Sequence, residues 1–119
     1  LDWLNDYPAE KIDYEKAIKA LMDKRYNDAL SDCYKSVEGV AKKVLGNNKS
    51  IDNNKDALLA TLKLSDEWKR MMGSYLTYAH EYGRHASKKR HDVDANEAEA
   101  FLYMTGLLIR LISNTVKRK

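Results

Sequence analysis

The three- and four-residue spacing of apolar residues constrains this fold most, because an α-helix gathers residues so spaced on one face. The spacing recurs over residues 8–25, 26–45, 57–62, 65–82 and 94–116, and the sequence contains only one proline. The sequence nowhere shows the strict apolar–polar alternation that indicates half-buried strands. We therefore expect an all-α fold, an antiparallel bundle of four main helices plus a short helix.

Local signals mark several helix ends. Gly46 follows the second pattern and tolerates the left-handed geometry typical of a helix C-terminus. Ser65 stands at an N-cap position, and Asp94 with Glu97 has the spacing of a capping box. The polar stretch 47–55 is predicted to be the clearest loop. On the fourth helix, the residues expected on the buried side are Trp68, Met71, Met72, Tyr75, Leu76, Ala79 and Tyr82.

Length and composition indicate one domain, residues 1–119, within the usual size range. The single cysteine excludes an intramolecular disulfide and a cysteine-rich zinc site. No apolar run is long enough to cross a bilayer, and no signal peptide is evident. We therefore expect a soluble cytoplasmic protein. Because the sequence starts at leucine, we interpret it as the C-terminal part of a longer protein with an N-terminal regulatory region.

The segment 84–91 concentrates charge after Gly83, where the fourth helical pattern ends. The net charge of the whole chain is only +3. Four of the seven residues 84–90 are positively charged: Arg84, Lys88, Lys89 and Arg90. Three histidines lie within or near this stretch: His80, His85 and His91. Crowded like charges repel, so folding alone does not favour such a run. A solvated turn between helices would account for it equally well.

Arg84 and His91 carry the chemistry most relevant to this segment. If the helix continued, they would share a face about 10 Å apart along the axis, and a break at Gly83 could bring them closer. A guanidinium binds phosphate, and an imidazole titrates near neutral pH. Metal-free RNA cleavage needs these two groups, since histidine can transfer protons and arginine can neutralise charge on the phosphorane.

A metal site is not predicted. His80, His85 and His91 are spaced by five and six residues, whereas ligands that align on a helix are spaced by three or four. The sequence has no HExxH pattern, and the surrounding cations disfavour a divalent metal. We therefore expect no metal and no other cofactor.

Glu38, within an otherwise apolar stretch, has two interpretations. It could point outward beside Lys42 at i+4, which we favour, or pair with a cation of the segment 84–90. Other conspicuous residues are interpreted as structural: Tyr75, Tyr78 and Tyr82 as packing, Met71 and Met72 as core filler, and Cys33 as a small buried hydrophobe.

Three stretches resemble HEPN domains, in particular the C-terminal domain of bacterial abortive-infection proteins. Arg84-His85, five residues and then His91 resemble the family's R-x(4–6)-H motif between the last two helices. The stretch 96–102 leads into the last helix as in those proteins, and 34–45 resembles their second helix, which often carries a central glutamate. The likeness covers about residues 26–116.

The resemblance implies a metal-independent endoribonuclease of a phage-defence or toxin–antitoxin system. Such proteins are usually homodimers in which the two motifs face each other, and RNA and an antitoxin are the implied partners. By position, Arg84 would stabilise the phosphate, His91 would transfer the proton and His85 would be the supporting polar group. Three cations would attract the RNA backbone: Lys88, Lys89 and Arg90.

The sequence also departs from the family pattern. Relatives often carry asparagine after the arginine and glycine before the histidine, where this chain has His85 and Arg90. Toxins silenced by nucleotidylation carry a tyrosine where this chain has Val93, so that control is not predicted. A catalytically silent HEPN module for RNA binding or homodimerisation is the alternative, and plain helical scaffolding is the third interpretation.

Overall fold

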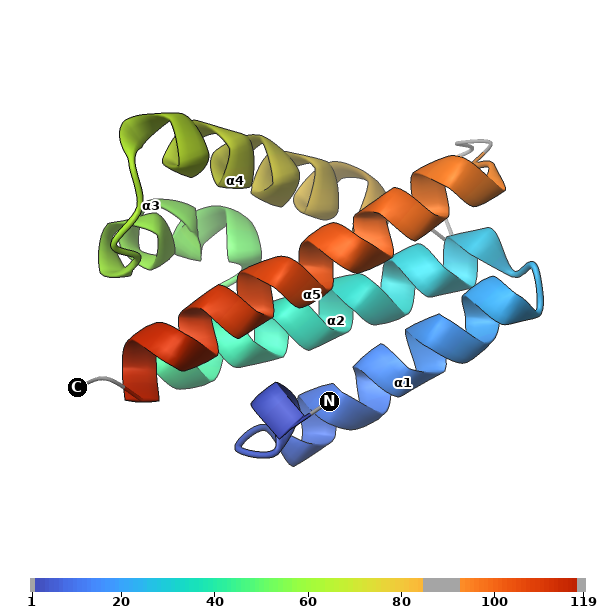
Figure 1. Ribbon diagram of the computed structural model, residues 1–119, viewed down its shortest axis with the longest axis horizontal. Coiled ribbons are helices and arrows are strands. Elements are labelled where there is room, and N and C mark those ends of the chain that lie inside the picture. The colour runs from blue at the N-terminus through green and yellow to red at the C-terminus, as the bar shows by residue number, and fades with distance from the viewer. Residues whose placement is uncertain (1, 85–92, 118–119) are drawn as a thin grey trace.

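The computed structural model describes residues 2–84 and 93–117, with the backbone alone at position 117, and every regular element in these residues is helical (Figure 1). In chain order the elements are η1 (Asp2–Leu4), α1 (Pro8–Met22), α2 (Tyr26–Leu45), α3 (Ile51–Thr61), α4 (Asp66–Tyr78), η2 (Ala79–Gly83) and α5 (Ala95–Lys117). η1 is a 3₁₀-helix and η2 a π-helix. The prediction of an all-α helical bundle is confirmed, with α3 as the short helix.

α1 and α2 form a tightly packed antiparallel pair. α1 ends at Met22, three residues before the predicted end near Arg25. Lys24 has φ of 62°, a left-handed conformation that cannot continue a right-handed helix. The chain therefore reverses there and enters α2 at Tyr26.

The end of α2 is confirmed, but the loop predicted after it is too long. Gly46 has φ of 66° and donates its N–H to the carbonyl of Lys42, as expected for a helix C-cap. α3 begins at Ile51, inside the stretch 47–55, so the loop prediction is wrong from there on. Ile51 is fully buried, whereas its polar neighbours Asp52 and Asn53 are exposed.

Two asparagines, Asn47 and Asn54, hydrogen-bond to each other across the loop between α2 and α3. Asn54 is 1% exposed, and its amide exchanges two hydrogen bonds of 2.9 and 3.0 Å with the amide of Asn47. Asn54 also donates to the carbonyl of Lys49 at 3.3 Å. The buried amide is thereby satisfied, as burial of a polar group requires.

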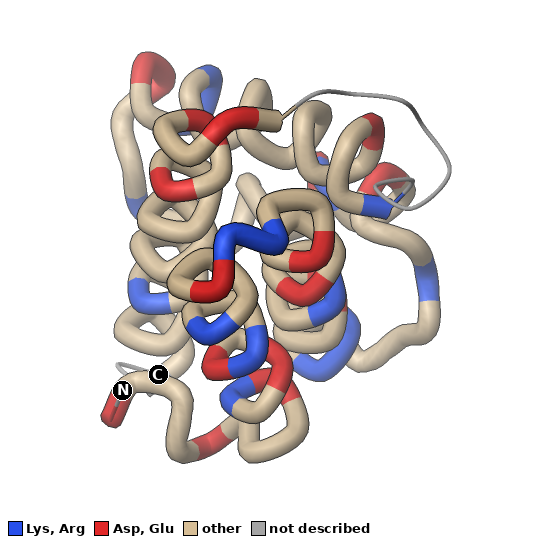
Figure 2. Tube along the Cα trace, turned by 90° about the vertical axis from the view of Figure 1, so that its right-hand side faces the viewer, with Lys and Arg blue, Asp and Glu red and all other residues tan. Residues whose placement is uncertain are grey.

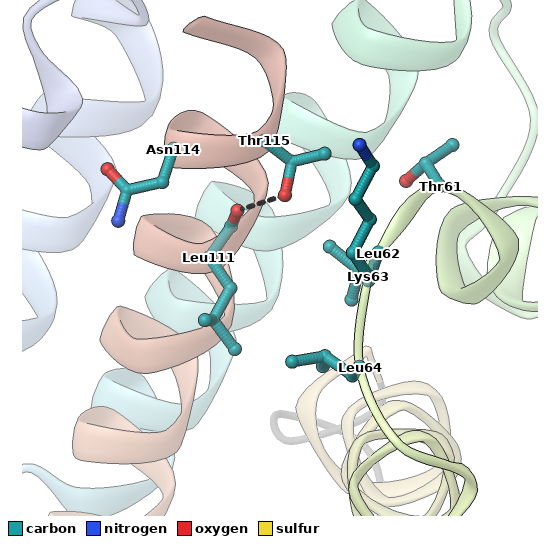
Figure 3. Close-up of a pocket in the computed structure, with 7 residues that line it drawn as sticks. All are labelled: Thr61, Leu62, Lys63, Leu64, Leu111, Asn114 and Thr115. Atoms are coloured by element: carbon teal, nitrogen blue, oxygen red, sulfur yellow. Dashed lines mark hydrogen bonds between the residues drawn. The ribbon is translucent and has the colours of Figure 1, made fainter. Parts of the chain in front are cut away.

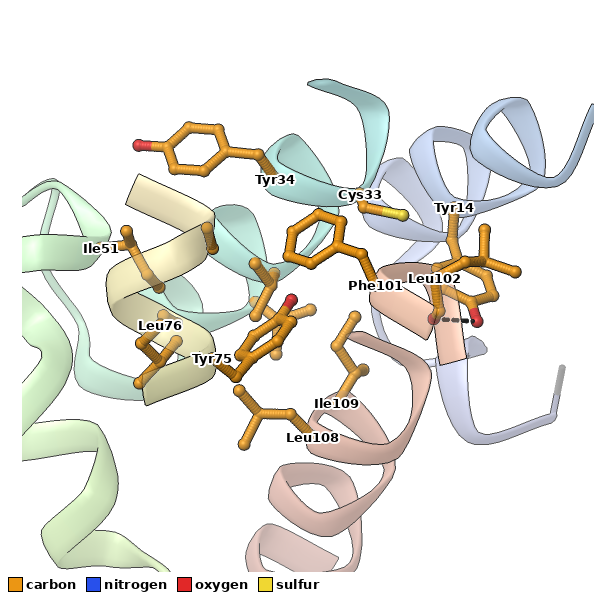
Figure 4. Close-up of a cluster of buried hydrophobic side chains, with 14 of the residues drawn as sticks. Tyr14, Cys33, Tyr34, Ile51, Tyr75, Leu76, Phe101, Leu102, Leu108 and Ile109 are labelled. Carbon is orange, nitrogen blue, oxygen red and sulfur yellow. Dashed lines mark hydrogen bonds between the residues drawn. The ribbon is translucent and has the colours of Figure 1, made fainter. Parts of the chain in front are cut away.

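The core lies around α2, which α1, α3, η2 and α5 all contact. Aliphatic and aromatic side chains from these helices interdigitate in it (Figure 4). Tyr75 shares a hydrogen bond of 2.6 Å with Thr105, whose hydroxyl also donates to the carbonyl of Phe101. Cys33 is fully buried, as predicted, and burial raises the pKa of its thiol to about 12.

One charged residue is buried between α1 and α2. Glu10 is 6% exposed, and its carboxylate lies 2.6 Å from the ammonium of Lys43. The hydroxyl of Ser36 donates to the Glu10 carbonyl at 2.8 Å. A Cβ at Gly39 would lie 2.5 Å from Glu10 Oε2, so this glycine provides the space that the carboxylate fills.

No helix within residues 2–84 and 93–117 is long and apolar enough to cross a membrane.

Candidate functional site

The structure places one of the six predicted site residues. Arg84 is exposed and directly follows η2. The other predicted catalytic residues, His85 and His91, lie outside the described residues, as do the predicted RNA-binding residues Lys88, Lys89 and Arg90.

Arg84 is held at the end of a π-helical turn. α4 is α-helical as far as Tyr78, and the chain then widens into η2, which ends at Gly83 as the sequence predicted. The N–H of Arg84 donates to the carbonyl of Ala79, five residues back, at 3.1 Å. π-Helical turns are rare in proteins, and those that do occur are often found at functional sites. No sequence signal indicated the change from α to π geometry.

Gly83 brings this turn against α2. A Cβ at position 83 would lie 2.8 Å from the Cβ of Tyr34 and 3.4 Å from the carbonyl oxygen of Leu30. The 2.8 Å separation is shorter than van der Waals contact. The Cβ of Tyr34 cannot move away, because it is bonded directly to the backbone of α2. Only glycine therefore fits, and the close approach fixes where Arg84 leaves the helix.

Arg84 lies near Tyr34, the first of three linked side chains on α2. The Tyr34 hydroxyl donates to Glu38 Oε2, and Glu38 Oε1 lies 3.3 Å from the Lys42 ammonium. Figure 4 shows Tyr34 at the margin of the core with its hydroxyl directed away from it. Burial first, and then the Glu38 carboxylate, raise the pKa of Tyr34, while the charge of Arg84 opposes this shift.

These contacts test the first interpretation of Glu38, while the cations at 85–90 invoked by the second lie outside the described residues. The favoured pairing with Lys42 is confirmed, but the Glu38 side chain is only 19% exposed and does not point freely into solvent. Tyr34 was not among the residues predicted for the candidate site. Tyr34 precedes Glu38 by four residues and Lys42 by eight, which places the three side chains on one face of the helix. This spacing could have indicated the contact between Tyr34 and Glu38.

Acidic residues cluster over the start of α5, as Figure 2 shows. Asp94 and Glu99 are exposed, and Glu97 is half-buried. The Asp94 carboxylate accepts the N–H of Glu97 at 2.8 Å, which confirms the predicted capping spacing. This acidic end lies next in sequence to the basic segment 84–91.

A shallow groove of about 290 Å³, the α4–α5 groove, separates α4 from α5. Its lining residues are Met71, Ser74, Tyr75, Tyr78, Glu97, Ala100, Phe101 and Met104. Met71 is 50% exposed and Trp68, one turn earlier, 43% exposed, so their predicted burial is wrong. α4 barely contacts α5, which leaves this edge uncovered. The predicted burial is confirmed for Met72 and Tyr75.

A second pocket, of about 300 Å³, lies at the opposite end of α5 (Figure 3). It is lined by Thr61, Leu62, Lys63, Leu64, Leu111, Asn114 and Thr115. The Thr115 hydroxyl donates to the carbonyl of Leu111 at 2.9 Å, so its proton is already used within α5.

Within the described parts of the chain, no three His, Cys, Asp or Glu residues are grouped so that they could hold a metal ion. No protein-family model, curated protein or solved structure matches the chain.

Proposed function

We propose that the protein is a metal-independent endoribonuclease of a bacterial phage-defence or toxin–antitoxin system, acting in the cytoplasm. The observation that carries the proposal is the placement of Arg84. An exposed guanidinium follows a π-turn locked onto α2 by Gly83, and a histidine-bearing basic segment continues from it. Folding requires neither the exposed arginine nor the run of cations, whereas binding of a phosphate chain benefits from both.

In the proposed reaction the ribose 2′-oxygen attacks the adjacent phosphorus while His91 takes the 2′-hydroxyl proton. The bond from phosphorus to the 5′-oxygen breaks, and that oxygen takes a proton from water, to which His91 afterwards releases the proton it holds. The products are a 2′,3′-cyclic phosphate and a 5′-hydroxyl. Arg84 neutralises charge that develops on the phosphorane, and His85 supports the pair. Lys88, Lys89 and Arg90 attract the RNA backbone.

The hydrogen-bonded chain on α2 that begins at Tyr34 supports the role assigned to Arg84. Glu38 has Lys42 as its charge partner, so this carboxylate does not have to be neutralised by Arg84. The guanidinium thus stays available to an incoming phosphate. The Tyr34 hydroxyl, which donates to Glu38, occupies a further acceptor position of the same carboxylate.

The decisive experiment incubates the purified chain with labelled single-stranded RNA in EDTA. Wild-type protein should produce ends with 2′,3′-cyclic phosphate. Arg84→Ala and His91→Ala should each lower the cleavage rate about 100-fold or more, the scale of a lost proton-transfer or charge-stabilising group. Arg110→Ala, which removes an exposed arginine from α5, is the matched control and should cleave normally.

Other outcomes separate the alternatives. Salt-sensitive RNA binding without cleavage would replace the enzyme by a silent RNA-binding module. Cleavage that survives His91→Ala would exclude the assigned site. Absence of both binding and cleavage would leave helical scaffolding.

The proposal includes a homodimer in which the two segments 84–91 face each other, and an antitoxin or N-terminal region that restrains them. Its support is the resemblance of the sequence to HEPN domains. Sedimentation equilibrium tests the dimer, and a chain that stays monomeric at high concentration would exclude a site composed from two protomers.

A further inference from the structure

One side of α5 is exposed along most of the helix. Its exposed residues recur at steps of three or four positions, the spacing that gathers side chains on one helix face. This face, the α5 strip, is turned away from the buried face of the helix, which includes Thr105, Leu108 and Ile112. Tyr103 and Leu107 lie at the middle of the strip and are 64% and 37% exposed. The strip consists of Asn96, Glu99, Tyr103, Leu107, Arg110 and Asn114, all of them exposed.

The α5 strip carries opposite charges on the two sides of its apolar middle. Glu99 precedes Tyr103 by four residues, and Arg110 follows Leu107 by three. Neither charged side chain forms an ion pair or a hydrogen bond within residues 2–84 and 93–117. Both charges can therefore pair with a molecule that carries the opposite charges in the opposite order.

The α5 strip matches itself when its direction is reversed. Tyr103 and Leu107 lie two residues on either side of position 105. Glu99 lies six residues before that position, and Arg110 lies five residues after it. A second α5 that ran antiparallel over the same midpoint would therefore bring Glu99 against an arginine and Tyr103 against a leucine. A parallel arrangement would instead set two Glu99 carboxylates side by side, where they repel.

We propose that the α5 strip is the docking surface for a second copy of this chain, with the two α5 helices antiparallel about a two-fold axis near residue 105. The order of the charges identifies the partner, because a two-fold interface must be complementary to itself. Two pairs, each between Glu99 of one copy and Arg110 of the other, flank the centre of the contact. Association removes the apolar surface of Tyr103 and Leu107 from water at that centre.

This contact goes beyond the proposed enzyme and does not rest on it. Ala95, the first residue of α5, lies ten residues from the axis, so the two helix starts are about 30 Å apart in the α5 pair. The proposed enzyme instead needs the segments that precede these helix starts to face each other. The two contacts are therefore distinct, and a chain that used both would assemble beyond a dimer.

Charge reversal tests the α5 pair by sedimentation equilibrium. Arg110→Glu sets two carboxylates against each other and Glu99→Arg sets two guanidinium groups against each other, so each should raise the dissociation constant at least tenfold. The double substitution Glu99→Arg with Arg110→Glu restores both pairs with reversed sign and keeps the net charge of the chain. It should therefore associate like wild type. Asp56→Arg, at an exposed position of α3, is the matched control and should change nothing.

Spin labels test the geometry of the pair. Cys33 is the only cysteine of the chain and is fully buried, so labels attach to engineered cysteines. Asn96→Cys and Asn114→Cys each place a label nine residues from the axis, one before it and one after it. Electron–electron resonance between the two copies should consequently give the same distance for both variants, about 30 Å.

The results separate this contact from the one in the proposed enzyme. Self-association that neither charge reversal weakens, or clearly unequal distances for the two labelled variants, would overturn the α5 pair and place the contact between copies at another face. A double substitution that associates no better than the single ones would also overturn it. A chain that stays monomeric at high concentration would exclude both contacts.

Discussion

Gly83 shows how a missing side chain can position a charged one. The backbone of η2 approaches α2 so closely that a methyl group at position 83 would lie 2.8 Å from the Cβ of Tyr34. The neighbouring Arg84 is consequently placed next to the Tyr34–Glu38 pair without a direct bond from its own side chain to either. The site thus depends on the packing of the helices as well as on the chemistry of its own residues.

Gly83→Ala is therefore expected to lower the free energy of unfolding by about 1–3 kcal/mol, the usual cost of overpacking. Gly73→Ala is the matched control. A Cβ at position 73 would lie 3.4 Å from Leu59 Cδ1, an ordinary contact, and alanine is a better helix former by roughly 0.5–1 kcal/mol. Urea denaturation measures both, and an equal effect of the two substitutions would contradict the close-packing account.

At the scale of elements, the docking of α1 on α2 combines apolar packing with one buried charge. Glu10 is 6% exposed and Lys43 is its partner at the edge of the interface. A buried carboxylate that loses its partner is left with the cost of desolvation. The two residues should consequently be coupled energetically.

Lys43→Met is expected to destabilise the protein by about 1–3 kcal/mol, toward the lower end because the Lys43 side chain is 48% exposed. Glu10→Gln together with Lys43→Met should cost less than the sum of the single substitutions, because no unpaired charge stays buried. A double-mutant cycle in urea measures this coupling. Strict additivity would show that the ion pair contributes nothing to docking.

The helices themselves could be predicted because their signals are local. The spacing of apolar residues located the helices. Capping side chains marked where two of them begin: the Ser65 hydroxyl accepts the N–H of Trp68 at the start of α4, and Asp94 caps α5. The start of α3 was missed because its first turn is polar on the exposed side. The burial of Met71 was misjudged because periodicity identifies an apolar face but not whether another helix covers it.

The candidate site could be predicted only in part, for the same reason. The concentration of charge indicated Arg84, and the structure places that residue exposed at the end of a helical turn. The contact of Gly83 with Tyr34 joins residues 49 positions apart, and no local pattern encodes it. The α4–α5 groove likewise arises from how far two helices diverge, which tertiary packing decides.

The whole molecule keeps several ionisable groups neutral in its core. Burial raises the pKa of the Cys33 thiol from 9.0 to about 12 and that of the Tyr14 hydroxyl from 10.0 to about 12. The folded state retains these protons over a range in which the unfolded chain releases them. Their contribution to stability is therefore fully present below pH 9 and is lost as the pH rises toward 12.

Thermal unfolding under reducing conditions should accordingly show a nearly constant midpoint around pH 8 and a decline from about pH 9 upward. Cys33→Ala should delay the onset of this decline, because its earliest contributor is removed. The comparison concerns the shape of the two pH curves, since the lost thiol also changes packing. Identical curves would show that Cys33 does not contribute to the alkaline transition.

The π-turn at Ala79–Gly83 has a consequence for how this end of the molecule can change. A turn closed over five residues holds one residue more than an α-turn, and one residue corresponds to about 100° of rotation. Arg84, which follows it, is thus out of phase with α4. A single deletion there would restore α-helical phase and swing Arg84 around the helix while leaving α4 itself unchanged. The number of residues in this turn therefore sets the direction in which Arg84 points, and it can change without any change in the helical bundle.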